Sequence, residues 1–185
     1  MVNNVGMSYE HPQEFLELSS TYVDTLINLN IVSLNAMTRI VLPQMVERKK
    51  GAVINISSFS AAIPAPLLSV YSASKSYVDL LSQGMAKEYS SKGITVQCVL
   101  PNMVVSNLSK IRRPSLMVPT PNVFVRSALS RLGIESRTCG FWSHDIMTFV
   151  AEIVPKSILV DNVYCQMKTI KAQALKKKQL AEKQK

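Results

Sequence analysis

Apolar residues in the first fifty positions recur at spacings of three and four, the period of a helix that packs one face on a core. The apolar positions are Tyr22, Leu26, Leu29, Ile31, Leu34, Met37 and Ile40. Ser19 or Ser20 can cap the first turn, and the Lys-Lys-Gly sequence at 49–51 closes the segment. The pattern therefore predicts one long helix, with a kink near Pro43 because proline removes a helical hydrogen bond.

Two short β-branched runs follow at residues 52–57 and 94–100, and a segment with helical spacing at 70–91 separates them. A strand, a helix and a strand in this order form a βαβ unit, in which the two strands run parallel. Two further helices are predicted at 122–132 and 140–154. The chain is therefore expected to have an α/β fold, with a parallel sheet and flanking helices.

Polar residues follow each expected strand. Ser57 and Ser58 close the first run, Pro101 and Asn102 follow the second, and the sequence Asn-Asn-Val-Gly at 3–6 would follow a strand near the amino terminus. In an open parallel sheet, ligands bind in the crevice beyond the carboxyl ends of the strands. We therefore expect one functional site where these three segments meet.

The segment at 70–91 carries the candidate chemistry. Tyr71 and Lys75 are four residues apart, so their side chains share one helix face. Tyrosine is a weak acid with a pKa of about 10, and a neighbouring ammonium lowers that pKa. Ser58, thirteen residues before the tyrosine, can donate a hydrogen bond to the same substrate oxygen. Taken alone, such a pair is common, and it usually marks a half-exposed ring beside a solvated lysine.

The combination of motifs is more specific than the pair. The sequences N-N-x-G at 3–6, N-I-S-S at 55–58, Y-x-x-x-K at 71–75 and a proline at 101 resemble the short-chain dehydrogenase/reductase family in identity, order and spacing. The resemblance implies a Rossmann-type parallel sheet, a nicotinamide cofactor, and hydride transfer between that cofactor and a carbonyl or alcohol.

The resemblance also implies catalytic roles. Tyr71 would be the general acid in carbonyl reduction, Lys75 would lower the pKa of Tyr71 and hold the nicotinamide ribose, and Ser58 would orient the substrate oxygen. Asn30 matches the helix asparagine that holds a water in the family's proton relay.

Four positions match the family's cofactor-binding segments. Asn4 and Gly6 lie in the motif that supports the central sheet and lines the cofactor cleft. Val104 and Ser106 lie where the family contacts the nicotinamide amide. The family usually has glycine after the proline and threonine four residues later, where this chain has Asn102 and Ser106; the serine keeps the hydroxyl.

Longer segments resemble one branch of the family, the very-long-chain 3-oxoacyl-CoA reductases, also described as 17-beta-hydroxysteroid dehydrogenases. They span 2–10, 42–48, 66–72 and 109–114. The branch implies NADPH, a 3-oxoacyl-CoA or steroid ketone as substrate, the fatty-acid elongation machinery as partner, and the cytosolic face of the endoplasmic reticulum. A homodimer and a peripheral membrane contact are also expected, and no nucleic acid.

Positive charge is concentrated at the carboxyl end. The net charge is +9, and the segment 168–185 holds seven lysines against one glutamate. We therefore divide the chain into a dehydrogenase domain at 1–167, with a substrate lobe at 107–165, and a lysine-rich tail at 168–185. The tail is expected to be a solvated helix, with a membrane-surface or nucleic-acid arm as the minority interpretation. No aromatic residue lies among those lysines to stack on bases.

The remaining features of the sequence are interpreted as structural and are given no catalytic or binding role. No run of about 20 nearly uninterrupted apolar residues is recognised as a membrane span. The three cysteines show no metal-site spacing, so no metal is expected. His11 and His144 are assigned to the surface or to helix packing, and Trp142 to the core or the substrate lobe.

The family's T-G-x-x-x-G-x-G phosphate loop is missing from the sequence, because no two of the six glycines are close enough to build it. We therefore expect the 185 residues to lack up to three β-α units, to bind NADPH weakly and to aggregate. The alternative to a reductase is a pseudoenzyme or interaction module that cannot hold the dinucleotide.

Overall fold

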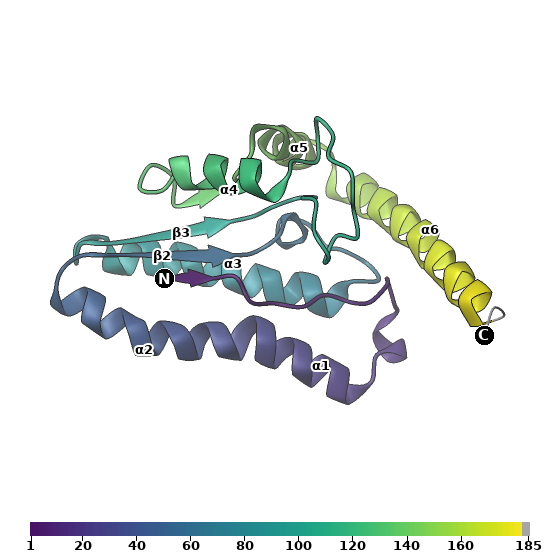
Figure 1. Cartoon of the computed structure of the whole chain (residues 1–185), viewed down its shortest axis with the longest axis horizontal. Coiled ribbons are helices and arrows are strands. Elements are labelled where there is room, and N and C mark those ends of the chain that lie inside the picture. The colour runs from purple at the N-terminus through teal and green to yellow at the C-terminus, as the bar shows by residue number, and fades with distance from the viewer. Residues whose placement is uncertain (183–185) are drawn as a thin grey trace.

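A computed structural model describes residues 1–182 of the chain; the last three residues of the predicted tail lie outside the described residues. Its centre is a parallel sheet with the strand order β1-β2-β3-β4 (Figure 1). The strands are β1 (Val2–Asn3), β2 (Gly51–Ile56), β3 (Ile94–Val99) and β4 (Arg137–Thr138). Each strand pairs with its neighbour in parallel, which confirms the predicted α/β class.

The long amino-terminal helix consists of three pieces. They are α1 (Ser20–Ile27), a single π-helical turn η2 (Asn28–Val32) and α2 (Ser33–Glu47). Ser19 caps the start, since its Oγ accepts the Tyr22 backbone N–H at 3.2 Å. Pro43 lies inside α2 without ending it. The π turn is not evident from the sequence, because one wider turn leaves the apolar spacing almost unchanged.

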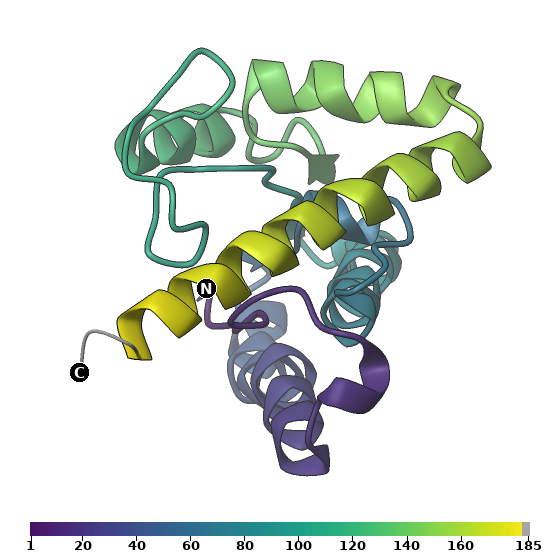
Figure 2. The same ribbon diagram turned by 90° about the vertical axis from the view of Figure 1, so that its right-hand side faces the viewer.

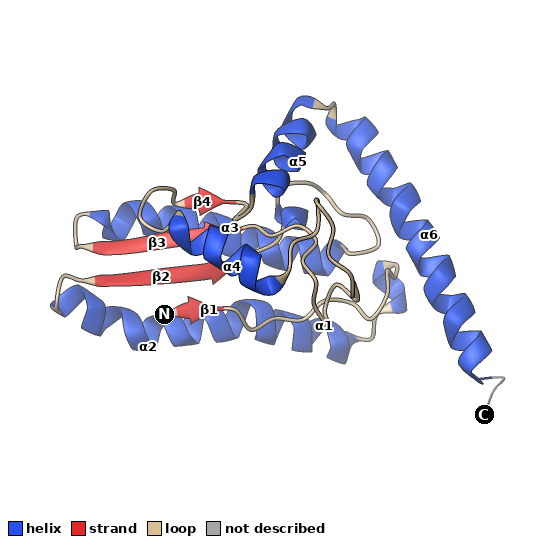
Figure 3. Ribbon diagram, turned by 45° about the horizontal axis from the view of Figure 1, so that its top comes forward, coloured by secondary structure: helices blue, strands red, loops and turns tan. Residues whose placement is uncertain are grey.

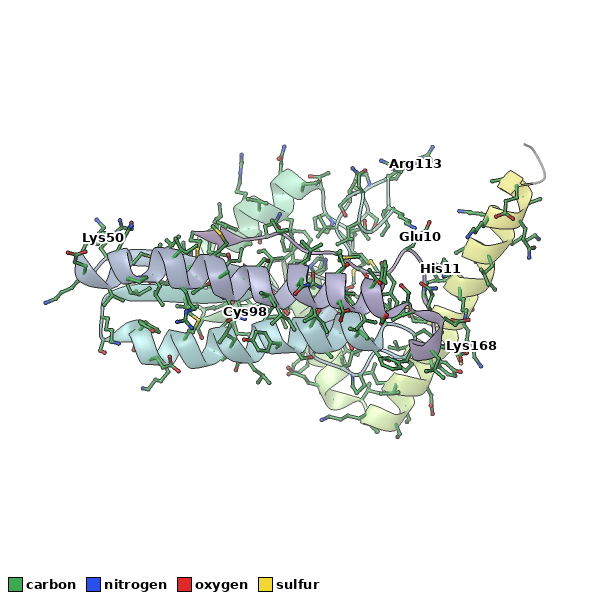
Figure 4. The ribbon with its side chains drawn as sticks, turned by 90° about the horizontal axis from the view of Figure 1, so that it is seen from below. Glu10, His11, Lys50, Cys98, Arg113 and Lys168 are labelled. Carbon is green, nitrogen blue, oxygen red and sulfur yellow. The ribbon has the colours of Figure 1, made fainter. Side chains whose placement is uncertain are left out.

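Helices cover both faces of the sheet. The pair formed by α1–α2 and α3 (Ser69–Ser90) lies side by side on one face (Figures 1 and 4), whereas α4 (Pro121–Ser130) and α5 (Trp142–Ile153) lie on the other. Short 3-10 turns, η1 (Phe15–Glu17) and η3 (Phe59–Ala61), precede α1 and α3. The predicted elements at 52–57, 70–91, 94–100, 122–132 and 140–154 agree with β2, α3, β3, α4 and α5 to within two residues, whereas β4 was not predicted.

Each face of the sheet has its own apolar core. The cluster under α2 and α3 consists of Leu42, Met45, Val53, Met85, Ile94 and Val96, and the cluster under α4 consists of Ile54, Val99, Phe124 and Ala128. Successive β2 residues Val53 and Ile54 thus enter opposite cores, as expected when side chains alternate along a strand that is buried on both faces.

The chain ends in a long helix, α6 (Lys156–Glu182), which runs diagonally away from α5 (Figure 3). It crosses the predicted boundary between the substrate lobe and the tail at 165–168 without a break. Lys171 of this helix pairs with Glu17 of η1 at 2.6 Å. The described part of the predicted tail, residues 168–182, is therefore the second half of one helix that is tied to the amino-terminal segment.

One segment among the described residues, Ser20–Glu47, is long and apolar enough to cross a membrane, so the prediction that no segment qualified is wrong by that criterion. The pattern has a structural cause. The helix buries residues such as Leu26 and Leu34, while Val32 and Ile40 are apolar and exposed. The buried polar residues Asn30 and Thr38 both bond to neighbouring elements, as in the core helix of a globular domain.

Candidate active site

The amino-terminal part of α3 is fastened to the end of β2 by two hydrogen bonds. Lys75 Nζ donates to the Ile56 carbonyl at 3.0 Å, and Ser57 Oγ donates to the Lys75 carbonyl at 2.7 Å. Because Ile56 is the last residue of β2, both bonds lie at the carboxyl edge of the sheet. The helix that carries the predicted Tyr-Lys pair is thereby fixed to the edge where parallel sheets bind ligands.

Lys75 is buried, with 6% of its surface exposed, and none of the ion pairs formed among residues 1–182 includes it. Burial disfavours the charged ammonium and lowers the pKa of Lys75 to about 8. The Nζ lies 5.9 Å from the centre of the Tyr71 ring. The two side chains therefore share one face, as predicted, and the cation sits at the edge of contact range with the ring.

The pKa of Tyr71 changes in the direction opposite to our expectation. Burial, the largest cause, raises the pKa of the phenol, and an interaction with the Ser58 hydroxyl opposes the rise. Lys75 was predicted to lower this pKa, but it is not among the groups that shift it, and desolvation outweighs the Ser58 interaction. In this structure Tyr71 is thus held in its protonated form, ready to donate a proton.

Ser58 lies directly beyond β2 and begins η3. Its Oγ accepts hydrogen bonds from the Ser60 backbone N–H at 3.2 Å and from Ser60 Oγ at 3.0 Å. Both contacts use the oxygen as an acceptor, so the Ser58 proton is directed elsewhere. The interaction with Tyr71 places the Ser58 hydroxyl beside the phenol, and its donation to a substrate oxygen stays a prediction.

Asn30 occupies the centre of the π turn and is 2% exposed. Its Nδ2 donates to Ser74 Oγ at 2.9 Å and to the Met7 carbonyl at 3.0 Å, and its Oδ1 accepts the Met7 N–H at 2.8 Å. Both protons of the Asn30 side-chain amide are therefore used in hydrogen bonds. A water molecule held by Asn30 would have to donate a hydrogen bond to the side-chain or backbone oxygen of this residue. The asparagine links the segment after β1, the π turn and α3.

Gly6 packs closely against Asn30 and Lys75. A Cβ at this position would lie 3.0 Å from Asn30 Oδ1 and 3.3 Å from Lys75 Nζ, so a side chain here would crowd both polar groups. The glycine therefore lets the segment after β1 approach them. The Lys75 ammonium uses one of its three donors on the Ile56 carbonyl, and the others could bind a hydroxyl such as that of the ribose of a nicotinamide cofactor.

The structure corrects the sheet-supporting role given to Asn4. Asn3 Nδ2 donates to Asn55 Oδ1 at 2.8 Å and to Thr38 Oγ1 at 3.2 Å, so Asn3 links β1 to β2 and α2. Asn4 is exposed, and its side chain forms no hydrogen bond to residues 1–182. Successive side chains leave a strand on opposite faces, so only one of two adjacent asparagines can reach the core. A role for Asn4 toward a cofactor stays a prediction.

The loop after β3 is held by a histidine that the sequence analysis had treated as incidental. His144 of α5 is fully buried; its Nδ1 accepts the Asn102 N–H at 3.3 Å, and its Nε2 lies 3.2 Å from the Met103 carbonyl. Burial lowers the pKa of His144, which favours the neutral ring that these two bonds require. An isolated histidine gives no such signal in the sequence, because its partners are backbone atoms some forty residues away.

Val104 and Ser106 lie on this loop, in the neighbourhood that the sequence predicted. Val104 is half-buried and packs on the apolar cluster under α4. Ser106 is exposed, and its Oγ accepts the Ser109 N–H at 3.0 Å. Among residues 1–182, no cluster of histidine, cysteine or acidic side chains is arranged to hold a metal ion.

The two ends of the molecule, before and beyond the strands of the sheet, carry different residues. Lys50 lies at one end of the molecule, whereas Glu10 and His11 lie at the other, beyond the carboxyl ends of the strands (Figure 4). Lys75, which contacts the last residue of β2, and Ser58, which follows that strand, lie toward the carboxyl ends of the strands. The space at the Lys50 end is lined by residues that were assigned no function.

Comparisons with known proteins agree with this arrangement. Residues 1–116 match the family model described as short chain dehydrogenase. Over 179 residues, 96% of this chain, the sequence is 47% identical to the very-long-chain 3-oxoacyl-CoA reductase of Homo sapiens. A second relative with this description, from Danio rerio, is 43% identical over 180 residues. The chain spans 57% and 58% of these two relatives.

Solved structures show the same fold. A short-chain dehydrogenase from Sphingobium yanoikuyae in complex with NADPH aligns with a TM-score of 0.62 at 30% identity, covering 70% of this chain and 52% of that one. A 7beta-hydroxysteroid dehydrogenase aligns with a TM-score of 0.79 over 88% of this chain and 66% of that one. Its identity of 17% makes it evidence for the fold alone.

Proposed function

Because the chain belongs to the short-chain dehydrogenase family, we propose that it supplies the proton-transfer residues of an NADPH-dependent reductase that converts 3-oxoacyl-CoA to 3-hydroxyacyl-CoA. The observation that carries the proposal is the placement of Tyr71, Lys75 and Ser58 together at the carboxyl end of β2. The identity of 47% to the human reductase supports the choice of substrate.

The proposed chemistry is reduction of a carbonyl group. The nicotinamide, when bound, supplies the hydride that adds to the carbonyl carbon. Tyr71 donates its phenolic proton to the carbonyl oxygen as negative charge develops there, and Ser58 donates a hydrogen bond to the same oxygen. The raised pKa of Tyr71 keeps the phenol protonated until the substrate oxygen becomes the stronger base.

Lys75 acts on the charge that this transfer leaves behind. Below its pKa of about 8 the side chain is an ammonium, and it lies 5.9 Å from the Tyr71 ring. The cation therefore stabilises the phenolate that forms when the proton leaves. In the proposal Lys75 also holds the ribose beside Gly6, while Val104 and Ser106 contact the nicotinamide amide and Asn30 holds a relay water.

The choice of NADPH rests on a relative with a bound cofactor. The Sphingobium yanoikuyae protein, at 30% identity, is described in complex with NADPH, whereas a 3-ketoacyl-(acyl-carrier-protein) reductase from Brucella melitensis, at 23% identity, is described with NADH. The more similar of the two therefore favours NADPH. An assay with both cofactors tests the choice directly.

The resemblance also supports a location and partners for the proposed enzyme. We place it on the cytosolic face of the endoplasmic reticulum, where it would work with the fatty-acid elongation machinery on acyl chains. A homodimer is part of the proposal, because α2 and α3 each expose a large apolar side chain, Ile40 at 65% and Leu80 at 70%.

A chimera tests the proposed function. The matching 179 residues of the human very-long-chain 3-oxoacyl-CoA reductase are replaced by those of this chain, and the product is assayed with a long 3-oxoacyl-CoA and NADPH. We expect turnover of the acyl-CoA that exceeds turnover of a 17-ketosteroid. A chimera that folds, as judged by its melting transition, but turns over neither substrate would contradict the proposal.

A further inference from the structure

The loop between β3 and α4 leaves the body of the molecule and returns to it. It runs from Leu100 to Thr120 without a helix or strand, and Figure 2 shows it as a long winding trace on the left of the view. A backbone bond from the Val105 N–H to the Pro119 carbonyl, at 3.1 Å, joins its two ends. Loops this long in a folded domain are uncommon and usually carry a function.

The loop between β3 and α4 is basic. It contains Lys110, Arg112 and Arg113 and no aspartate or glutamate, so its formal charge is +3. Lys110 Nζ donates to the Glu10 backbone carbonyl at 2.6 Å, and Arg112 Nη1 donates to Asn107 Oδ1 at 3.2 Å. The ion pairs of the described chain include none of the three cations. Figure 4 shows Arg113 at the outer surface of the molecule.

Ser115 places an exposed hydroxyl directly after the two arginines. Within the described chain its Oγ forms no hydrogen bond, whereas the hydroxyls of Ser106 and Ser109 bond to each other at 3.1 Å. The sequence Arg-Arg-Pro-Ser-Leu spans 112–116, and Leu116 is 74% exposed. Nowhere else in the 185 residues do two consecutive basic residues stand three and two positions before a serine or threonine.

The backbone presents Ser115 at the start of a surface turn. Pro114 has a fixed φ and favours an extended conformation at Arg113, so the arginines precede the serine on an extended segment. After the serine the chain turns back, because Ser115 and Val118 exchange two backbone hydrogen bonds at 2.9 and 3.1 Å. An enzyme that binds the segment in extended form has to open these two bonds to reach Leu116.

We propose that Ser115 is a phosphorylation site for a serine kinase that recognises paired basic residues before the substrate hydroxyl. Acidic side chains of the kinase bind the two arginines by charge-assisted hydrogen bonds, and an apolar pocket takes Leu116. Ser115 Oγ attacks the γ-phosphorus of ATP, the bond from that phosphorus to the bridging oxygen of ADP breaks, and the serine proton passes to a base of the kinase. The phosphate carries a charge of about −2 and lowers the charge of the loop from +3 to about +1.

Phosphorylation of the purified full chain tests the site. The chain is incubated with Mg²⁺, ATP and the catalytic subunit of cyclic-AMP-dependent protein kinase, and the product is analysed by intact mass and peptide mapping. We expect one phosphate, at Ser115, and none in Ser115→Ala. Ser130→Ala is the matched control, because Ser130 is exposed on α4 but follows no pair of basic residues.

Two further comparisons separate the arginines and the fold from the serine itself. Arg112→Ala and Arg113→Ala are each expected to lower kcat/KM of the kinase for the chain roughly tenfold or more, because each removes a charged hydrogen-bonding group. Arg126→Ala, at an exposed position of α4, should leave it unchanged. A synthetic peptide of residues 109–119 should be phosphorylated with a kcat/KM comparable to that of the folded chain.

Three results would overturn the proposal. One is equal phosphate incorporation by Ser115→Ala and the native chain. Another is phosphorylation of the peptide but not of the folded chain, which would show that the fold withholds the serine. The third is a native kcat/KM in both arginine variants, which would show that the arginines do not recruit the kinase. Far-UV circular dichroism confirms that the native chain and each variant are folded.

Discussion

The Asn30 amide joins the backbone of Met7 by two hydrogen bonds, one accepted from the N–H at 2.8 Å and one donated to the carbonyl at 3.0 Å. The side chain thereby pairs with the segment after β1 much as a neighbouring strand would. A third bond, to Ser74 at 2.9 Å, extends the link to the helix that carries Tyr71. One buried side chain therefore holds two sides of the proposed site together.

Replacing Asn30 by Ala is expected to lower the free energy of unfolding by about 3 kcal/mol, because it leaves the buried backbone groups of Met7 and the Ser74 hydroxyl without this partner. Urea denaturation measures the change. Asn28→Ala is the matched control, because Asn28 lies in the same π turn but is exposed. Equal losses in the two variants would mean that the turn, and not the Asn30 contacts, sets the stability.

Tyr71→Phe is expected to reduce turnover of a 3-oxoacyl-CoA by the chimera roughly 10²–10⁴-fold, the contribution typical of a general acid. The phenyl ring keeps the packing, so the melting temperature should change little. Tyr77→Phe is the control on the same helix; Tyr77 Oη contacts Asn35 on the exposed side. Turnover by Tyr71→Phe equal to that of Tyr77→Phe would remove Tyr71 from the mechanism.

Lys75→Met is expected to flatten the dependence of stability on alkaline pH. Burial lowers the pKa of Lys75 from 10.5 to about 8, so between these values the unfolded chain binds more protons than the folded chain, and stability of the native protein rises with pH. Methionine cannot titrate and retains the packing. The loss of the bond to the Ile56 carbonyl is independent of pH, so it shifts the curve without changing its slope.

Urea denaturation of both proteins at several pH values between 8 and 10.5 provides the comparison. The free energy of unfolding of the native protein should rise more steeply across this window than that of Lys75→Met. Parallel curves would show that Lys75 titrates near its ordinary value and is not desolvated as the structure indicates.

The fold was largely predictable, because apolar periodicity and β-branched runs depend on burial, which the sequence records directly. The π turn at Asn28–Val32 was not, since it changes hydrogen bonding more than the spacing of apolar residues. Within the site, motif spacing located Tyr71, Lys75 and Ser58. The pKa shifts of Tyr71 and Lys75 depend mainly on the depth of burial, which motif spacing does not supply.

The choice between adjacent asparagines shows the same limit. The motif at 3–6 names both Asn3 and Asn4, and only the register of β1 against β2, which pairs Asn3 with Asn55, decides which one reaches the core. Register is a property of long-range pairing. A single sequence therefore predicts that the motif supports the sheet, but it does not assign the bond to one residue.

The 185 residues are expected to bind NADPH weakly by themselves. Backbone amides in a glycine-rich turn normally hold the pyrophosphate, and no two of the six glycines here are close enough to form that turn. Lys75, which lies beside Gly6, is proposed to contact the ribose and not the pyrophosphate. Isothermal titration of the purified chain measures the affinity, and micromolar binding would contradict this expectation and count against the pseudoenzyme alternative.

His144→Phe tests how the loop after β3 is held. His144 packs against Phe124 and Phe141 with ring centres 5.7 Å apart in both cases, so a phenyl ring preserves the aromatic contacts and removes the two bonds to Asn102 and Met103. The substitution is expected to cost roughly 1–3 kcal/mol of stability at neutral pH. Hydrogen exchange at the Asn102 amide should accelerate more than exchange in β3.

The same substitution is expected to change the acid side of the stability curve. Burial lowers the pKa of His144 below its ordinary value of 6.5, so the unfolded chain binds the extra proton first and native stability falls as the pH drops from 6.5 through the folded-state pKa. Phenylalanine removes this contribution. The difference in unfolding free energy between the two proteins should therefore shrink on acidification, whereas a difference independent of pH would show that the ring is not kept neutral by the loop.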